Sequence, residues 1–108
     1  MKLTDKELEI MALLWRRGAP MTATEIIEAS ENRTWKDNSI FVIMNTLIKK
    51  KAVTYAKPKP TSTNSARSYA PAISLEDYMI SKLHSIRQRG LRIDKDALIK
   101  GIREMEEG

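Results

Sequence analysis

The chain has 108 residues and contains no cysteine, which excludes disulfides and thiolate metal sites. A chain of this length forms one domain, or a small domain with an appendage, and buries only a modest core. The longest apolar run, residues 10–15, is far shorter than a membrane span, and residues 1–5 lack the apolar segment of a signal peptide. We therefore expect a cytoplasmic protein that does not enter a membrane.

The net charge of +5 is concentrated in the middle of the chain. Residues 1–35 hold five basic and six acidic residues, and residues 74–108 hold seven of each. Residues 36–73, in contrast, hold seven basic residues against Asp37 alone. A merely solvated surface scatters its charge, whereas a surface that binds a polyanion concentrates positive charge.

Two capping boxes predict the first two helices. Residues 4–7 (Thr-Asp-Lys-Glu) are expected to open a helix that carries Leu8, Met11, Leu14 and Trp15 on one face and ends at Gly18. Residues 22–25 (Thr-Ala-Thr-Glu) open a second, short helix, which the polar residues 30–33 end.

Residues 34–51 are expected to form one central helix, with Asp37 as its cap and Trp35 in the core at its base. Its apolar residues have the spacing of a buried stripe: Ile40, Ile43, Met44, Leu47 and Ile48. The opposite arc carries short polar or methyl-bearing residues and leads into a lysine cluster: Asn38, Val42, Asn45, Thr46 and Lys49 to Lys51. Such an arc suits the edges of bases in the major groove of DNA, although an ordinary amphipathic helix with a solvated lysine end has the same pattern.

The period then changes from helix to strand. Residues 52–56 and 66–70 alternate and favour two strands, and Pro71 is expected to end the second. Between them, residues 57–60 (Lys-Pro-Lys-Pro) predict an edge or hairpin arm. A basic hairpin after a helix-turn-helix is a wing, whose Lys57, Lys59 and Arg67 are placed to reach phosphates or a minor groove.

Two further amphipathic helices are predicted after residue 73, separated by Gly90, with Asp94 capping the second. Helices of this kind cannot bury their apolar stripes against each other alone, so we expect them to pack on a second copy of the chain. Folding back onto their own domain is the alternative. The residues expected at a dimer interface are Leu75, Tyr78, Met79, Leu83, Ile86, Leu98, Ile99, Ile102 and Met105.

Several motifs resemble the penicillinase repressor family, the BlaI, MecI and CopY type of bacterial repressor. They are residues 3–11 with Leu14-Trp15, then Thr34-Trp35, Ser39-Ile40, residues 47–50, and Tyr69-Ala70-Pro71. The resemblance implies a winged helix-turn-helix repressor that binds palindromic operators as a homodimer through its C-terminal helices. It places Asn38, Ser39, Val42 and Thr46 in the groove. The chain departs from the family at Thr46, where relatives often have arginine, and at Lys51, which replaces a glycine.

The sequence offers no catalytic constellation. His84 is the only histidine and lacks a partner motif, and the four glycines are isolated, so no phosphate-binding loop is indicated. We expect no enzyme activity, no cofactor and no metal site.

The resulting expectation is a mainly α protein with a small β-hairpin wing. Residues 1–72 form the winged helix-turn-helix and residues 73–108 a helical dimerisation region. The function expected is a homodimeric repressor on double-stranded operator DNA, and the alternative is a winged-helix module whose basic face binds an acidic protein partner. The residues expected to contact DNA are Asn38, Ser39, Val42, Asn45, Thr46, Lys49, Lys50, Lys57, Lys59 and Arg67.

Overall fold

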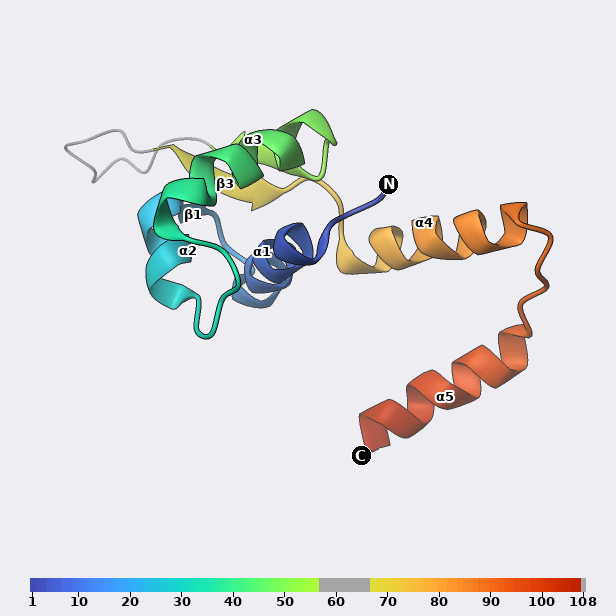
Figure 1. Cartoon of the computed structure of the whole chain (residues 1–108). Coiled ribbons are helices and arrows are strands. Elements are labelled where there is room, and N and C mark those ends of the chain that lie inside the picture. The colour runs from blue at the N-terminus through green and yellow to red at the C-terminus, as the bar shows by residue number, and fades with distance from the viewer. Residues whose placement is uncertain (57–66, 108) are drawn as a thin grey trace. The chain divides into compact units, whose positions relative to one another are not determined.

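The computed structural model describes residues 1–56 and 67–107, so Lys57, Lys59 and the predicted Lys-Pro-Lys-Pro arm lie outside the described residues. The chain divides into two compact units, Met1–Leu75 and Glu76–Gly108 (Figure 1). Among the residues the structure describes, none of the helices combines the length and the apolar character that a membrane span requires.

The first unit opens with α1 (Asp5–Arg17) and α2 (Ala23–Ala29), and both predicted capping boxes are confirmed. In each box a threonine hydroxyl accepts a hydrogen bond from a glutamate amide, and the glutamate carboxylate accepts one from the threonine amide. Gly18 ends α1 with a left-handed φ of 68°, a conformation that favours glycine.

A three-stranded antiparallel sheet completes this unit, in the order β1-β3-β2. The strands β2 (Val53–Ala56) and β3 (Ser68–Pro71) form the predicted hairpin, with Tyr55 opposite Tyr69. The short β1 (Met21–Thr22) pairs with the other edge of β3, and no pattern in the sequence indicated it. Pro71 belongs to β3 as its last residue, a position where a proline interrupts little of the hydrogen-bond ladder.

The central helix differs from the prediction at its start. Residues 30–36 form no helix, Asp37–Ser39 make a single 3-10 turn, and α3 runs over Ile40–Lys49. The prediction that Asp37 caps the helix is wrong, because its carboxylate forms an ion pair with Arg33 instead. After α3, Lys51 takes the left-handed φ of 64° that glycine usually supplies.

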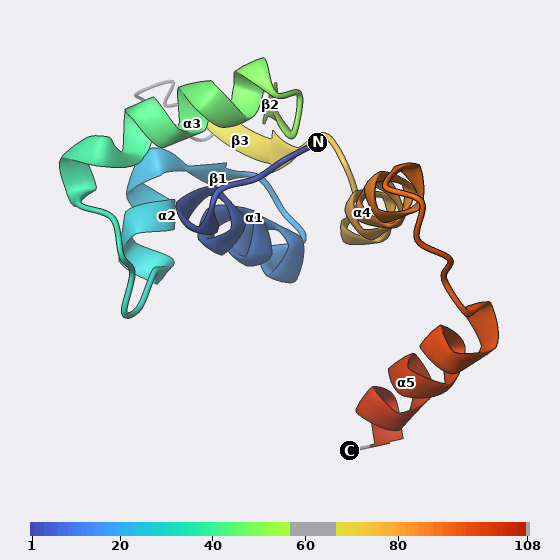
Figure 2. The ribbon, with the colours of Figure 1, turned by 45° about the vertical axis from the view of Figure 1, so that its right-hand side comes forward.

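The core lies where α1, α2 and α3 pack together with the sheet, an arrangement visible in both ribbon views (Figures 1 and 2). Trp35 is buried, as predicted, and the central stripe of α3 is buried except for the partly exposed Ile48. In α1 the expected apolar face is wrong at one position: Leu8 is exposed, and Ile10 is buried. The large apolar side chains that are fully buried are Ile10, Met11, Leu14, Met21, Ile26, Ile40, Met44 and Leu47.

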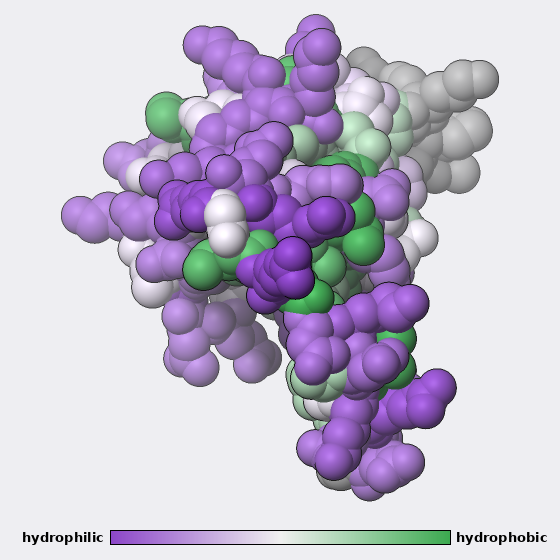
Figure 3. All heavy atoms as spheres, turned by 90° about the vertical axis from the view of Figure 1, so that its right-hand side faces the viewer, coloured by the Kyte–Doolittle hydropathy of each residue, from purple (hydrophilic) through white to green (hydrophobic). Residues whose placement is uncertain are grey.

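The second unit contains most of α4 (Leu75–Gln88) and all of α5 (Lys95–Glu107). The predicted break at Gly90 and the predicted cap at Asp94 are confirmed, since Gly90 has a φ of 84° and the Asp94 carboxylate accepts a hydrogen bond from the Ala97 amide. Most apolar residues of the two helices remain exposed. On the face shown in Figure 3, hydrophobic residues lie open to solvent between hydrophilic ones.

Candidate nucleic-acid interface

The outward face of α3 and of the turn before it is open to solvent. Asn38, Val42, Asn45 and Lys49 are all exposed there, while the opposite side of α3 is buried against the core. Asn38 stands in the 3-10 turn, two residues before α3 begins at Ile40, and Ser39 beside it is partly buried. The structure thus brings four of the predicted DNA-contacting residues onto one accessible surface.

Thr46 differs from its neighbours on this face. Its side chain is partly buried, and its hydroxyl donates a hydrogen bond of 3.0 Å to the Val42 carbonyl one turn earlier. The hydroxyl keeps its oxygen lone pairs, so it can accept a hydrogen bond from a ligand while its own proton stays with the backbone.

Lys50 has a different environment from the one expected of a phosphate-binding lysine. Its ammonium donates to Glu7 Oε1 at 2.5 Å and to the Lys2 carbonyl at 2.8 Å, and its side chain is partly buried. Two of its three donors are therefore used inside the protein, where they join the end of α3 to the start of α1. Lys49 and Lys51, on either side of Lys50, are exposed.

Glu7 takes part in both the capping box and this ion pair. Burial would raise the pKa of its carboxyl, but the hydrogen bond and charge of Lys50 and the hydrogen bonds from Thr4 outweigh burial and lower the pKa below its usual value. The charged form of this carboxylate is consequently favoured beside Lys50, at the end of α3.

Arg33 holds the loop that leads into α3, a role that sequence analysis missed. Its guanidinium donates to the carbonyls of Ile27 and Trp35 at 3.1 and 3.0 Å, pairs with Asp37, and lies 4.8 Å from the centre of the Trp35 ring. The opposite charges of Arg33 and Asp37, four residues apart, were the available signal, but Asp37 was predicted to cap the helix. These contacts fix the loop directly before Asn38 and thereby the position of Asn38.

The wing contributes Arg67, which is exposed and lies over the ring of Tyr55 at 4.9 Å. Tyr55 in turn contacts Tyr69, with 5.5 Å between ring centres. Burial and the neighbouring Tyr55 raise the pKa of Tyr69, and Arg67 offsets this in part. Arg67 is thereby held beside the strands while its charge remains accessible to an anion.

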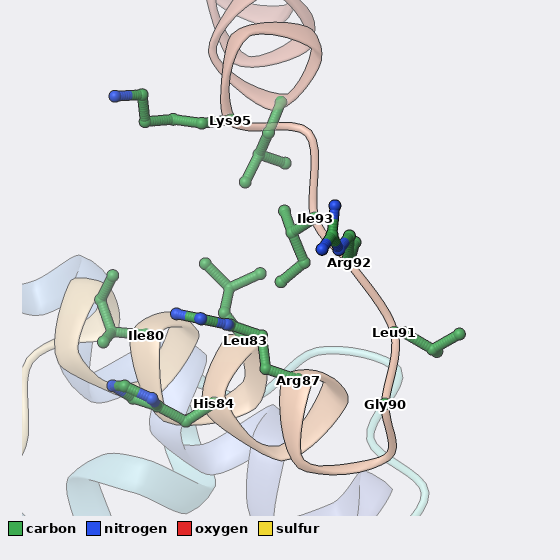
Figure 4. Close-up of a pocket in the computed structure, with 10 residues that line it drawn as sticks. Ile80, Leu83, His84, Arg87, Gly90, Leu91, Arg92, Ile93 and Lys95 are labelled. Atoms are coloured by element: carbon green, nitrogen blue, oxygen red, sulfur yellow. The ribbon is translucent and has the colours of Figure 1, made fainter.

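The residues expected at a dimer interface are exposed in α4 and α5, apart from the partly buried Leu83 and from Tyr78. Tyr78 is already buried in the single chain, and its place at a dimer interface stays a prediction. A hollow of about 780 Å³ lies within this unit, lined by apolar and basic residues of α4, the linker and α5. In Figure 4, Leu83 and Ile93 extend toward each other there, while Leu91 points away.

His84 also lines this hollow, but the described residues contain no group of three His, Cys, Asp or Glu side chains that would hold a metal ion.

Comparison with known proteins agrees with this geometry. A family model described as penicillinase repressor matches residues 3–106. The chain belongs to the penicillinase repressor family. The resemblance inferred from the sequence motifs is thereby confirmed.

Among individual relatives, the chain is 32% identical over 88 residues to the penicillinase repressor of Bacillus licheniformis, covering 82% of this chain and 65% of that protein. The chain thus spans slightly less than two thirds of the length of this relative. The solution structure of monomeric Bacillus licheniformis BlaI, in complex with the blaP half-operator, matches with a TM-score of 0.56 at 30% identity, covering 72% of this chain and 89% of that one. This match confirms the predicted winged-helix fold.

The ferric uptake regulator of Francisella tularensis matches at a TM-score of 0.53 and 13% identity, covering 67% of this chain and 54% of that one. At this identity the match supports the fold alone.

Proposed function

We propose that this protein is a transcriptional repressor that binds a palindromic operator in double-stranded DNA as a homodimer. The observation that carries the proposal is the division of α3 into a buried face and an exposed face of Val42, Asn45 and Lys49. The same fold in a relative 30% identical to this chain was solved on a half-operator. A helix with one anchored face and one accessible polar face fits the major groove.

Each exposed residue has a chemical role in this proposal. The amides of Asn38 and Asn45 hydrogen-bond to base edges, for which adenine offers the matching donor and acceptor. Lys49 and, on the wing, Arg67 bind phosphates without distinguishing bases. Lys50 contributes indirectly, by joining α3 to α1 through Glu7.

The homodimer is formed by the apolar residues that α4 and α5 leave exposed. Leu98, Ile99 and Ile102 lie on one side of α5, and each is about 40% exposed in the single chain. A second copy that covers them would present two α3 helices to half-sites about 34–36 Å apart, or one turn of DNA.

The test is fluorescence anisotropy of the purified protein against labelled fragments of its own upstream DNA, in a salt series. A sequence-specific repressor binds one near-palindromic fragment in preference to the others, and this preference persists as the salt concentration rises. Equal, salt-sensitive binding to every fragment, or no binding, would contradict the proposal and favour the alternative of an acidic protein partner.

Two variants separate the roles on α3. Lys49→Ala should weaken binding to all duplexes by a similar factor and reduce the slope of log K against log salt by about 0.9 for each phosphate that Lys49 neutralises in the wild type. Asn38→Ala should instead change which fragment is preferred. An Asn38→Ala protein with the preference of the wild type would show that Asn38 does not contact a base.

A further inference from the structure

Two large apolar side chains on α3 are more exposed than any other in the described part of the first unit. Phe41 is 60% and Val42 68% exposed, although both belong to the helix that supplies Met44 and Leu47 to the core. While they are exposed, these two side chains contribute no free energy of apolar burial to the folded chain. A ligand that covers them would gain the free energy of burying their surface.

The surroundings of Phe41 indicate on which side the ligand lies. Together with Asn45, Phe41 lines a hollow of about 390 Å³ whose other walls come from residues 22–24, at the start of α2, and from the wing residues Tyr55, Arg67 and Tyr69. None of these lining residues is acidic, and Arg67 adds a positive charge. Phe41 is therefore set in a surface that favours an anion, and Val42 is the next residue of the same helix.

We propose that Phe41 and Val42 contact the C5-methyl groups of neighbouring thymines in the major groove of the operator. The inference rests on the proposed DNA-binding function and adds to it the class of base that this face selects. Thymine carries the apolar group of the major-groove edge, and apolar side chains are its usual partners.

The neighbouring amides point to the same base pair. Asn45 follows Phe41 by one helical turn, and Asn38 precedes Val42 by the same spacing. An asparagine that pairs with the N6 and N7 atoms of adenine stands at a base pair whose thymine presents its methyl group on the same groove edge. Amides beside apolar side chains thus match half-sites rich in A·T pairs.

A protein partner fits this surface less well. A stable protein–protein contact buries about 800 Å² on each side and has an uncharged centre. Here two apolar side chains are flanked by Lys49 and Arg67, both exposed. Stacking of Phe41 on a base is also disfavoured, because the bases of a duplex are already stacked.

The test removes single methyl groups from the DNA. The tightest-binding duplex is selected from a random-sequence pool, and each thymine in it is replaced in turn by deoxyuridine, which keeps the hydrogen-bonding groups and lacks only the methyl. For the wild type, we expect one or two positions in each half-site at which the affinity falls about fourfold, the factor that corresponds to about 0.8 kcal/mol for one buried methyl.

Variants of the protein then assign these positions. Phe41→Ala and Val42→Ala should each bind the thymine duplex more weakly than the wild type does. At the position that the missing side chain contacts, deoxyuridine should weaken binding by the variant no further, so that the effects of the protein change and the DNA change are not additive. Both side chains are exposed, so the fold should persist, which circular dichroism checks. Lys49→Ala is the matched control, because it weakens binding while leaving the fourfold effect of deoxyuridine intact.

Three results would overturn the inference. If a preferred duplex exists and deoxyuridine has no effect at any position, the inference fails while the proposed function stands. If Phe41→Ala and Val42→Ala respond to deoxyuridine as the wild type does, these residues are not the methyl contacts. If no duplex is preferred at all, the proposed function fails and the inference fails with it.

Discussion

The helices α3 and α5 are both amphipathic, but their apolar faces have opposite environments. In α3 the residues Ile40, Ile43, Met44 and Leu47 are at most 8% exposed, whereas in α5 the residues Leu98, Ile99, Ile102 and Met105 are between 39% and 80% exposed. The difference lies in what surrounds each helix, since α3 packs on α1, α2 and β2. Amphipathic spacing thus tells which face of a helix is apolar, and the neighbouring elements decide whether that face is covered.

The largest effect is expected on α5, at the proposed dimer interface. Ile102→Asp should raise the dissociation constant of the homodimer at least about a hundredfold, because an unpaired carboxylate in an apolar interface costs several kcal/mol. Sedimentation velocity over a range of concentrations measures this. The control is Lys100→Asp, a larger change in charge two residues away and hence on the other side of the helix. Equal effects of the two changes would argue against this face as the interface.

A matched pair of leucines compares the two helices directly. Leu47→Ala should lower the free energy of unfolding by about 3 kcal/mol at every protein concentration, because it opens a cavity in the core of one chain. Leu98→Ala should have an effect that grows with protein concentration, because its contacts form on dimerisation. Urea denaturation at high and low concentration distinguishes the two. A large, concentration-independent loss of stability for Leu98→Ala would instead show that α5 folds back on its own chain.

A smaller effect is expected where α3 is joined to α1. Lys50→Met should cost about 2 kcal/mol of stability, since it keeps most of the apolar stem and leaves the buried Glu7 carboxylate without its cation. Lys49→Met is the matched control and should change stability little, because Lys49 is exposed. Equal denaturation midpoints for the two variants would contradict the proposed role of the Lys50–Glu7 pair.

The same pair gives the smallest expected effect, a dependence of stability on pH. The folded-state pKa of Glu7 is lowered from an ordinary value of 4.5, so its contribution is complete above that value and is lost as the pH falls through the lower, folded-state pKa. Glu7→Gln keeps the capping box but should remove this contribution, so the variant loses less stability than the wild type on acidification. Thermal unfolding followed from about pH 6 to about pH 3 measures the difference. Glu28→Gln, at an exposed position of α2, should behave as the wild type does.

Local signals in the sequence were sufficient for much of the fold. Both capping boxes, the stop at Gly18, the break at Gly90 and the cap at Asp94 depend on residues within a few positions of one another, and all of them are confirmed. The wing strands and the buried stripe of α3 follow from periodicity in the same way. The family followed from motifs spread along the chain in a fixed order.

Contacts between distant residues were decided by the tertiary structure. Lys50 stands in a run of three lysines, and only the approach of Glu7, 43 positions earlier, separates it from its two exposed neighbours. The strand β1 is two residues long and exists because β3 provides a partner for it. Asp37 had the sequence context of a helix cap, but its carboxylate forms an ion pair with Arg33. The physical reason is the same in each case: a side chain's charge and spacing are local properties, while its partner is supplied by whichever part of the folded chain comes near it.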